Sequence, residues 1–275
     1  MIFAIFLCLF ASAVLCQDTF YGIDYGVNIY ACPSYDSIES DFSALKSYTS
    51  RIRIYGLSLC NQGALAMQAT QQLGMRLYLG IWVDGDPNTF ETELAALQRL
   101  VDTQEKWDNI DGLIVGSEIL YRNDVTPDQL IAALDRARAV LPPSVAVTTA
   151  DTYDHFSAAV LDHVDFVMMQ GVSIEQAWET LLDHYQETVK RLSTDKPIRI
   201  SETGWPSAGP AHGSAEASLT NQRRYLRAAV CGARTNGIEM LYFSAQDEAY
   251  KGGVEAHFGF LSRVQQQQRD LDLIC

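Results

Sequence analysis

Short runs of apolar and β-branched residues recur along the chain and alternate with longer segments of helical periodicity. Each run is bounded by polar or turn-forming residues, which is typical of a strand buried in a sheet. The runs predict eight strands, at Tyr25–Tyr30, Arg51–Gly56, Arg76–Trp82, Gly112–Ser117, Val145–Ala150, Val164–Gln170, Ile198–Ser201 and Met240–Ser244.

The segments between these runs place apolar residues at the spacing of an amphipathic helix. Thr126 followed by Pro127 is a helix start signal, because threonine caps a helix and proline fits its first position. The predicted helices are Ser37–Tyr48, Phe90–Val101, Pro127–Val140, Trp178–Leu192 and Asn221–Thr235.

Continuously apolar strands separated by helices indicate a parallel sheet that is covered on both faces. Eight such units can close into a (β/α)8 TIM barrel, and 275 residues suit a single barrel domain. An open doubly wound sheet is the alternative, and it is disfavoured because no glycine-rich phosphate loop follows the first strand.

The first sixteen residues contain no charged side chain and run from large apolar residues to small ones. This pattern predicts a signal peptide over residues 1–16, cleaved near Cys16 or Gln17, and a catalytic domain over 17–275. An N-terminal membrane anchor is the alternative, although a spanning helix needs about 20 apolar residues. We therefore expect a secreted protein, extracellular or in a cell wall, with no membrane contact after cleavage.

Cleavage would remove Cys8 and Cys16 and leave an even number of cysteines, which in a secreted chain suggests two disulfides. The four remaining cysteines allow three pairings, and we prefer Cys32–Cys60 with Cys231–Cys275. Free buried thiols are the alternative.

The net charge of −14 disfavours nucleic acid as a partner, because an acidic surface repels phosphates, but a neutral polysaccharide is not repelled. The histidines show no ligand spacing, and Asp84 with Asp86 suits a turn better than a calcium loop. We expect no metal and no cofactor. A serine hydrolase is unsupported, since the chain has no Gly-x-Ser-x-Gly elbow.

Two glutamates follow predicted strands directly: Glu118 after the fourth and Glu202 after the seventh. Active sites of such barrels lie at the carboxyl ends of the strands, so the two side chains should meet at the mouth of the barrel. Cleavage of a glycosidic bond needs such a pair, one protonated to donate to the leaving oxygen and one ionised to attack the anomeric carbon.

The segment Glu202-Thr203-Gly204-Trp205-Pro206-Ser207 resembles the nucleophile motif of glycoside hydrolase family 17, the β-1,3-glucanase family. Weaker matches to that family, closest to its fungal members, span most of the chain: Arg53–Gly56, Val115–Glu118 with Leu120-Tyr121-Arg122, Gln246–Lys251 and Val254–Phe260. The resemblance implies a retaining mechanism with Glu202 as nucleophile and Glu118 as acid/base. Retention predicts carboxyl groups about 5–5.5 Å apart and a raised pKa for Glu118.

Three positions depart from the family pattern. Ser117 stands where most enzymes of the wider superfamily have an asparagine that contacts the sugar, and serine also occurs there in fungal members. Met169-Gln170 and Phe243-Ser244-Ala245 stand where fungal members often have Trp-Gln and Phe-Glu-Ala. A stacking surface is lost at Met169, whereas Gln170 can keep a hydrogen bond.

Aromatic faces pack on the C–H face of a sugar ring, and its hydroxyls need polar partners. The candidate substrate-binding residues at or just past strand ends are Tyr30, Tyr55, Trp82, Ser117, Tyr121, Gln170, Trp205 and Phe243. The resemblance adds Glu248, Lys251 and Glu255, and implies that Glu248 and Lys251 support Glu118; a surface ion pair is the alternative. Trp178 and Glu179 suit helix packing better than a sugar subsite.

These features predict a monomeric enzyme that acts on β-1,3-glucan polysaccharide or oligosaccharide. Endo-hydrolysis is the leading hypothesis. Glucanosyl transfer during cell-wall remodelling is the alternative, because it uses the same two carboxylates. A non-catalytic glucan-binding wall protein is disfavoured, because both carboxylates are present.

Overall fold

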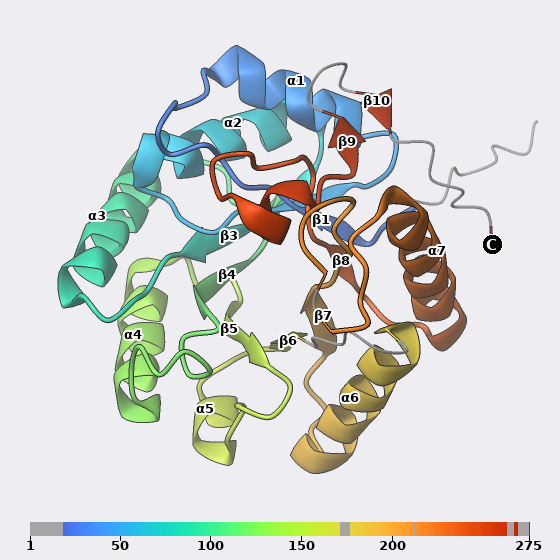
Figure 1. Cartoon of the computed structure of the whole chain (residues 1–275). Helices are drawn as coiled ribbons and strands as arrows, with labels where there is room; N and C mark the ends of the chain where they lie inside the picture. Colours follow the sequence, from blue (N-terminus) through green and yellow to red (C-terminus); the bar gives the residue numbers. More distant parts are fainter. Residues whose placement is uncertain (1–18, 171–176, 212, 263–266, 269–274) are drawn as a thin grey trace, which may run out of the picture.

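The computed structural model describes residues 19–170, 177–211, 213–262, 267–268 and 275. Its central sheet has eight parallel strands in the order β7-β6-β5-β4-β3-β2-β1-β8, and a bridge between Ile200 and Met240 joins β7 to the residue before β8. The strands therefore ring a common axis, with helices outside them (Figure 1), and the predicted (β/α)8 barrel is confirmed. The strands are β1 (Gly22–Asp24), β2 (Arg51–Arg53), β3 (Arg76–Ile81), β4 (Ile110–Ser117), β5 (Val147–Thr152), β6 (Val167–Gln170), β7 (Ile198–Glu202) and β8 (Leu241–Tyr242).

The helices that cover the barrel are α1 (Tyr35–Leu45), α2 (Gln62–Leu73), α3 (Pro87–Thr103), α4 (Pro127–Val140), α5 (Ala158–Asp162), α6 (Ala177–Leu192) and α7 (Leu219–Asn236). The helix α4 has the predicted bounds, because Thr126 and Gln129 form a reciprocal capping box at its start. The helix α3 begins earlier than predicted, because Asp86 caps it and Pro87 occupies its first turn. Short 3-10 helices η1 (Leu59–Asn61) and η2 (Gly253–His257) and a small hairpin, β9 (Leu261–Ser262) with β10 (Gln267–Gln268), complete the described elements.

Two helices were not predicted from the apolar pattern. The buried face of α2 includes Gln62, Gly63 and Thr70, so the helix shows no clear apolar stripe. The helix α5 is a single short turn that buries Val160.

The first strand lies earlier than predicted, at Gly22–Asp24 in place of Tyr25–Tyr30. Tyr25 and Val27 are buried; the Tyr25 amide donates to the Arg53 carbonyl of β2 at 2.8 Å, and its ring packs edge-on against Phe42 of α1. The prediction of a strand here was wrong because buried loop residues give the same apolar pattern as a buried strand. The strands β2 and β8 also end sooner than predicted, which places Tyr55 and Phe243 in loops above the barrel.

Side chains alternate between two cores along each strand. On β6, Val167 and Met169 face the large outer core beneath the helices, and Met168 belongs to a separate inner cluster with Tyr78, Ile114, Phe166 and Leu241. A layer of polar side chains is buried at the carboxyl ends of the strands, including Asp24, Arg53, Ser117 and Gln170. The apolar interior of the barrel therefore ends in a charged layer, which is where the two glutamates lie.

Both preferred disulfides are confirmed. Cys32 bonds to Cys60 and joins the loop after β1 to η1, and Cys231 of α7 bonds to Cys275. The predicted signal peptide, residues 1–16, lies outside the described residues. Within the described residues, no helix has the length and apolar character required to cross a bilayer.

Replacing Cys32 and Cys60 together by serine should lower the free energy of unfolding by roughly 3 to 4 kcal/mol, because the cross-link of residues 28 apart restricts the unfolded chain. Thermal unfolding should show a Tm lower by about 10 °C. Wild-type protein under the same non-reducing conditions is the control. An unchanged Tm would show that the bond contributes little.

Candidate active site

Glu118 follows β4 in a sharply turned segment. Gly116 and Glu118 both have left-handed backbones, with φ of 77° and 58°, and the Glu118 amide donates to the Ala150 carbonyl at 2.8 Å. A non-glycine residue in this region costs about 1–2 kcal/mol, so the surroundings must hold it there. Asp151 of β5 does so by accepting hydrogen bonds from the amides of Leu120 and Tyr121, at 2.8 and 3.2 Å.

Glu202 ends β7, and three donors converge on one of its carboxylate oxygens. Its Oε1 accepts from Arg53 Nη1 at 2.8 Å, Ser117 Oγ at 3.0 Å and Gln170 Nε2 at 2.6 Å. These partners come from β2, β4 and β6, so the strand ends together fix the carboxylate. Hydrogen bonds of this kind favour the ionised form, which is the form a nucleophile needs. All three donors bind Oε1, and within the described residues Oε2 receives no hydrogen bond.

Ser117 has its whole hydrogen-bonding capacity engaged inside this network. It donates to Glu202 and accepts from Arg53 Nη2 at 3.2 Å and from Gln170 Nε2 at 2.9 Å. One hydroxyl has one donor and two acceptor positions, so nothing remains for a sugar. The structure therefore places Ser117 and Gln170 as supports of Glu202, and their predicted contact with substrate stays a prediction.

Arg53 was part of a quoted motif but was not among the predicted site residues. Its side chain is 1% exposed, and besides Glu202 it faces Asp24, whose Oδ1 lies 3.7 Å from Nη1. Asp24 is fully buried, and neither of its carboxyl oxygens has a hydrogen-bond partner among the described residues. Burial raises the pKa of Asp24 well above its usual value against the opposing effect of Arg53, and the Glu202 charge adds to the increase. The closer ion pair of Arg53 is therefore the one with Glu202, at 2.8 Å.

The two glutamates differ in their electrostatic surroundings. Burial, followed by the negative charge of Glu202, raises the pKa of Glu118 to about 7, although Arg122 opposes the increase. The Arg122 guanidinium lies 4.0 Å from Glu118 Oε2, a contact too long for a hydrogen bond. The raised pKa predicted for Glu118 is thus confirmed, and the pair combines a proton-holding carboxyl with a donor-stabilised carboxylate. The predicted separation of about 5–5.5 Å stays a prediction.

The segment after β8 forms a buried support next to β1. Glu248 is 2% exposed and pairs with Lys251 Nζ at 2.7 Å, and the Tyr250 hydroxyl contacts both Glu248 and the Val27 carbonyl. The charges of Glu248 and Lys251 act on Asp24, whereas Glu118 responds chiefly to Glu202 and Arg122. The support for Glu118 implied by the resemblance stays a prediction, and the burial of Glu248 leaves it little access to substrate.

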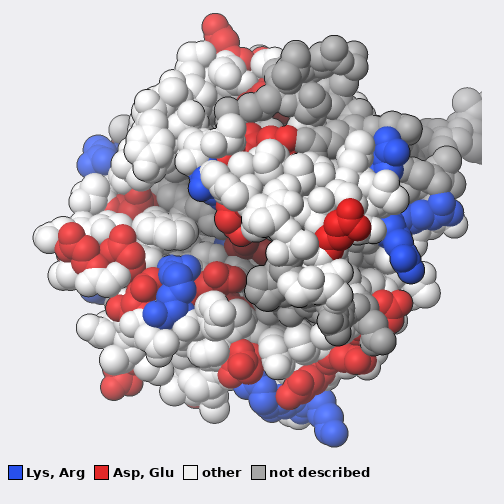
Figure 2. Space-filling view, in the orientation of Figure 1, with Lys and Arg blue, Asp and Glu red and all other residues white. Residues whose placement is uncertain are grey.

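Other predicted binding residues do reach the surface of this face. The exposed fractions of Tyr30, Tyr121 and Trp82 are 81%, 55% and 37%. Phe243 is partly exposed beside Lys251, whose Nζ lies 5.1 Å from its ring, and Tyr55 is partly exposed with the Arg53 guanidinium over its ring at 4.5 Å. Figure 2 shows acidic and basic side chains meeting in the hollow at the centre of this face. The hollow thus has charged groups within it and aromatic residues on the surrounding loops.

Two predicted binding residues lie away from this arrangement. Glu255 is exposed on η2 and forms no ion pair or hydrogen bond with any described residue. Trp205 is turned toward α7, where its indole Nε1 donates to the Glu216 carbonyl at 3.0 Å and its ring lies 5.8 Å from that of Tyr225. No group of described histidine, cysteine and acidic side chains could hold a metal ion.

Comparison with known proteins gives concordant matches. The sequence model of the BtgE/BtgC glycoside hydrolase domain matches residues 22–259. A protein named glucan 1,3-beta-glucosidase from Saccharomyces cerevisiae is 29% identical over 88% of this chain and 86% of its own length. The structure of an active-site mutant of Rhizomucor miehei beta-1,3-glucanosyltransferase in complex with laminaritriose is 45% identical over 92% of this chain and 96% of that one, with a TM-score of 0.86.

The electrostatic coupling of the two glutamates can be measured directly. Replacing Glu202 by glutamine removes a negative charge next to Glu118, so the pKa of Glu118 should fall below about 7. It should stay above the ordinary value of 4.5, because burial is the larger cause and persists. The measurement is a pH titration of carboxyl ¹³C signals, with the Glu118 signal assigned by its loss in Glu118→Gln.

Glu239→Gln is the control, because Glu239 pairs with Arg199, away from Glu118. That variant should leave the Glu118 titration unchanged. An identical Glu118 pKa in wild type and Glu202→Gln would show that the two carboxyls do not interact.

Proposed function

Because the chain belongs to the BtgE/BtgC family of glycoside hydrolases, within glycoside hydrolase family 17, we propose that it cleaves β-1,3-glucan by a retaining double displacement. The observation that carries this proposal is the asymmetry of the two carboxyls. Glu202 has one oxygen fixed by three donors, and Glu118 has a pKa of about 7. Such a pair supplies a nucleophile and an acid in the same site.

In the first step, Oε2 of Glu202 attacks the anomeric carbon and forms a glycosyl-enzyme. The bond from that carbon to the leaving oxygen breaks, and Glu118 gives its proton to this oxygen. With a pKa of about 7, Glu118 is largely protonated in the mildly acidic range and is still a strong enough acid to donate.

In the second step, Glu118, now ionised, takes a proton from an incoming hydroxyl. The oxygen of that hydroxyl attacks the anomeric carbon, and the bond to Glu202 breaks, so the carboxylate is restored. Two inversions give net retention of the β-anomer. The loss of negative charge from Glu202 in the first step also lowers the pKa of Glu118, which helps it to release the proton that it later takes back.

The identity of the incoming hydroxyl decides between hydrolysis and transfer. Water gives shorter products, and the 3-hydroxyl of a second glucan chain gives a longer one. Transfer is the second candidate, and it is favoured by the 45% identity to the Rhizomucor miehei beta-1,3-glucanosyltransferase over nearly the full length of both chains. Among the more distant relatives, the names glucan 1,3-beta-glucosidase and glucan endo-1,3-beta-glucosidase support hydrolysis. Because these relatives are fungal glucan-processing proteins, we propose that the chain acts outside the cell or in the cell wall.

The proposal is tested by a time course on a linear β-1,3-linked glucose hexasaccharide. Wild type should convert it, with the β-anomer as the first product by ¹H NMR, and Glu202→Gln and Glu118→Gln should each lose at least about a thousandfold in rate. Both variants should keep the wild-type circular dichroism spectrum and Tm within a few degrees.

Mass spectrometry of the same samples separates the two candidates. Products longer than the hexasaccharide support transfer, and exclusively shorter products at high substrate concentration support hydrolysis. No conversion by wild type, or an α-anomer as first product, would overturn the retaining β-1,3-glucan assignment.

The support that Ser117 gives to Glu202 predicts a kinetic defect of defined type. Ser117→Ala removes one hydrogen bond to the carboxylate, an interaction worth about 1.5–3 kcal/mol, so kcat should fall about 10- to 100-fold with little change in KM. Ser201→Ala is the matched control, because Ser201 is also buried beside the site but donates to the Met169 carbonyl. Equal losses in the two variants would contradict the assigned role of Ser117.

A further inference from the structure

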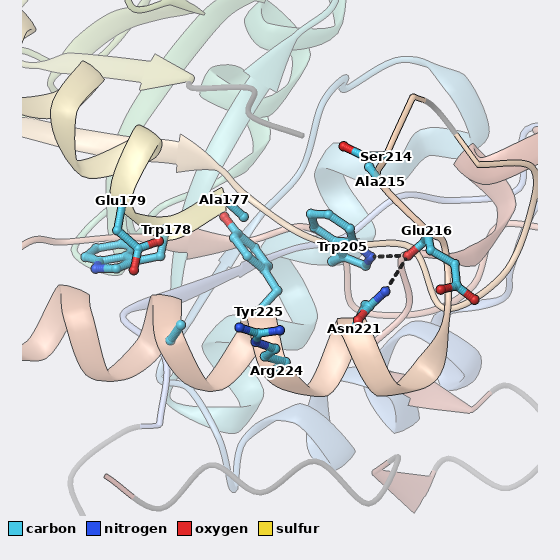
Figure 3. Close-up of a pocket in the computed structure, with 11 residues that line it drawn as sticks. Ala177, Trp178, Glu179, Trp205, Ser214, Ala215, Glu216, Asn221, Arg224 and Tyr225 are labelled. Atoms are coloured by element: carbon cyan, nitrogen blue, oxygen red, sulfur yellow. Dashed lines mark hydrogen bonds between the residues drawn. The ribbon is translucent and has the colours of Figure 1, made fainter. Parts of the chain in front are cut away.

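A cavity lies beside the loop between β7 and α7, and neither Glu202 nor Glu118 is among the residues that line it. It has a volume of about 360 Å³ and is bounded by the start of α6, the first turns of α7 and the loop residues Ser214, Ala215 and Glu216. Figure 3 shows the side chains of Trp178, Trp205 and Tyr225 in this region, between Glu179 and Glu216. The volume falls in the range of about 300–1,000 Å³ typical of small-molecule sites.

The aromatic walls of the cavity are held in fixed positions. Trp178 is 9% exposed and packs so closely on α7 that a Cβ on Gly232 would lie 2.1 Å from its Cε2. Trp205 is fixed by the bond from its Nε1 to the Glu216 carbonyl, and the Tyr225 hydroxyl bonds to Thr203, the residue after Glu202. Rigid aromatic side chains offer contact area at a small cost in conformational entropy.

The polar lining can both donate and accept hydrogen bonds. Glu179, Glu216 and Arg224 are exposed side chains on the cavity and form no ion pair with any described residue. Asn221 Nδ2 is already engaged by the Glu216 carbonyl, at 3.0 Å. Two carboxylates with one guanidinium suit hydroxyl groups, which can bond to either, and they repel an acidic ligand.

We propose that this cavity is a second saccharide-binding site, which takes a short end of a neutral β-glucan chain outside the catalytic centre. Aromatic faces with uncommitted donors and acceptors are the combination that recognises a sugar ring. The choice of β-glucan over other neutral sugars rests on the proposed function. The site would hold a glucan end close to the strand that carries Glu202.

The chain has four tryptophans, which makes the test direct. Trp178 and Trp205 line the cavity, Trp82 lies under Arg122 beside Glu118, and Trp107 donates to Gln104 away from both. Laminaritriose is titrated into the Glu202→Gln variant, and the indole N–H signals are followed by ¹H–¹⁵N NMR. We expect the Trp178 and Trp205 signals to move with a different Kd from that of Trp82, and the Trp107 signal to stay fixed.

Two further variants, each in the Glu202→Gln background, locate the binding. Ala228→Trp fills the cavity from α7 and should abolish the movement of Trp178 and Trp205 while the Trp82 titration persists. Thr235→Trp is the matched control, because it adds an indole to an exposed position near the end of the same helix, outside the cavity, and should change nothing. Arg224→Ala removes hydrogen-bond donors from the cavity and should raise the Kd measured at the Trp205 signal about tenfold. This variant replaces Ala228→Trp as the test if Ala228→Trp does not fold.

The proposal is overturned if laminaritriose moves neither Trp178 nor Trp205, or if their movement follows the Trp82 curve and survives both Ala228→Trp and Arg224→Ala. A trimer of galacturonic acid should leave both signals in place, and equal binding of that trimer would overturn the preference for a neutral sugar. Failure of the proposed function is a separate result, because it appears as no turnover of the hexasaccharide by wild type.

Discussion

The bond between Arg53 and Glu202 is the interaction on which the organisation of the site depends. An arginine that is 1% exposed inside a barrel has lost its water, and a buried cation is tolerated only next to an anion with good geometry. Glu202 supplies that anion at 2.8 Å. The interaction that makes Arg53 tolerable in the core therefore also fixes the Glu202 carboxylate in place, as the proposed mechanism requires.

Asp24 determines that this charge compensation goes to Glu202. If Asp24 were ionised, it would compete for Arg53 from 3.7 Å, but its complete burial favours the neutral form. At Glu118, burial and the nearby Glu202 charge are the two largest causes that raise the pKa. The two carboxyls are thus separated in function by the number of donors that each one receives, three at Glu202 Oε1 and a single distant guanidinium at Glu118.

The sequence predicted the features that depend on local pattern. Glu118 and Glu202 were identified because each follows an apolar run, and a barrel brings the ends of such runs together. Arg53 and Asp24 were not identified, although each places a charged residue within a strand that is otherwise buried, and this break in the pattern was the available signal. Their pairing joins residues from different strands and depends on register, which periodicity does not specify. The direction of the Trp205 side chain was missed for a similar reason. The sequence shows that Trp205 follows β7, but its turn toward α7 depends on contacts with Glu216 and Tyr225, which are distant in sequence.

Ser117, where most enzymes of the wider superfamily have asparagine, shows how the hydrogen bonds of the network are directed. An amide would offer two donors and an oxygen acceptor, whereas a serine hydroxyl has a single proton. Because the carboxylate can only accept, that proton must go to Glu202, and Arg53 with Gln170 fill the remaining positions on the hydroxyl. Arg53, Ser117 and Gln170 each donate to Oε1 of Glu202. The side-chain oxygen of Gln170 is buried without a donor among the described residues. A buried acceptor left unpaired is destabilising by about 1–3 kcal/mol, so the network that fixes the orientation of the Glu202 carboxylate costs stability at Gln170.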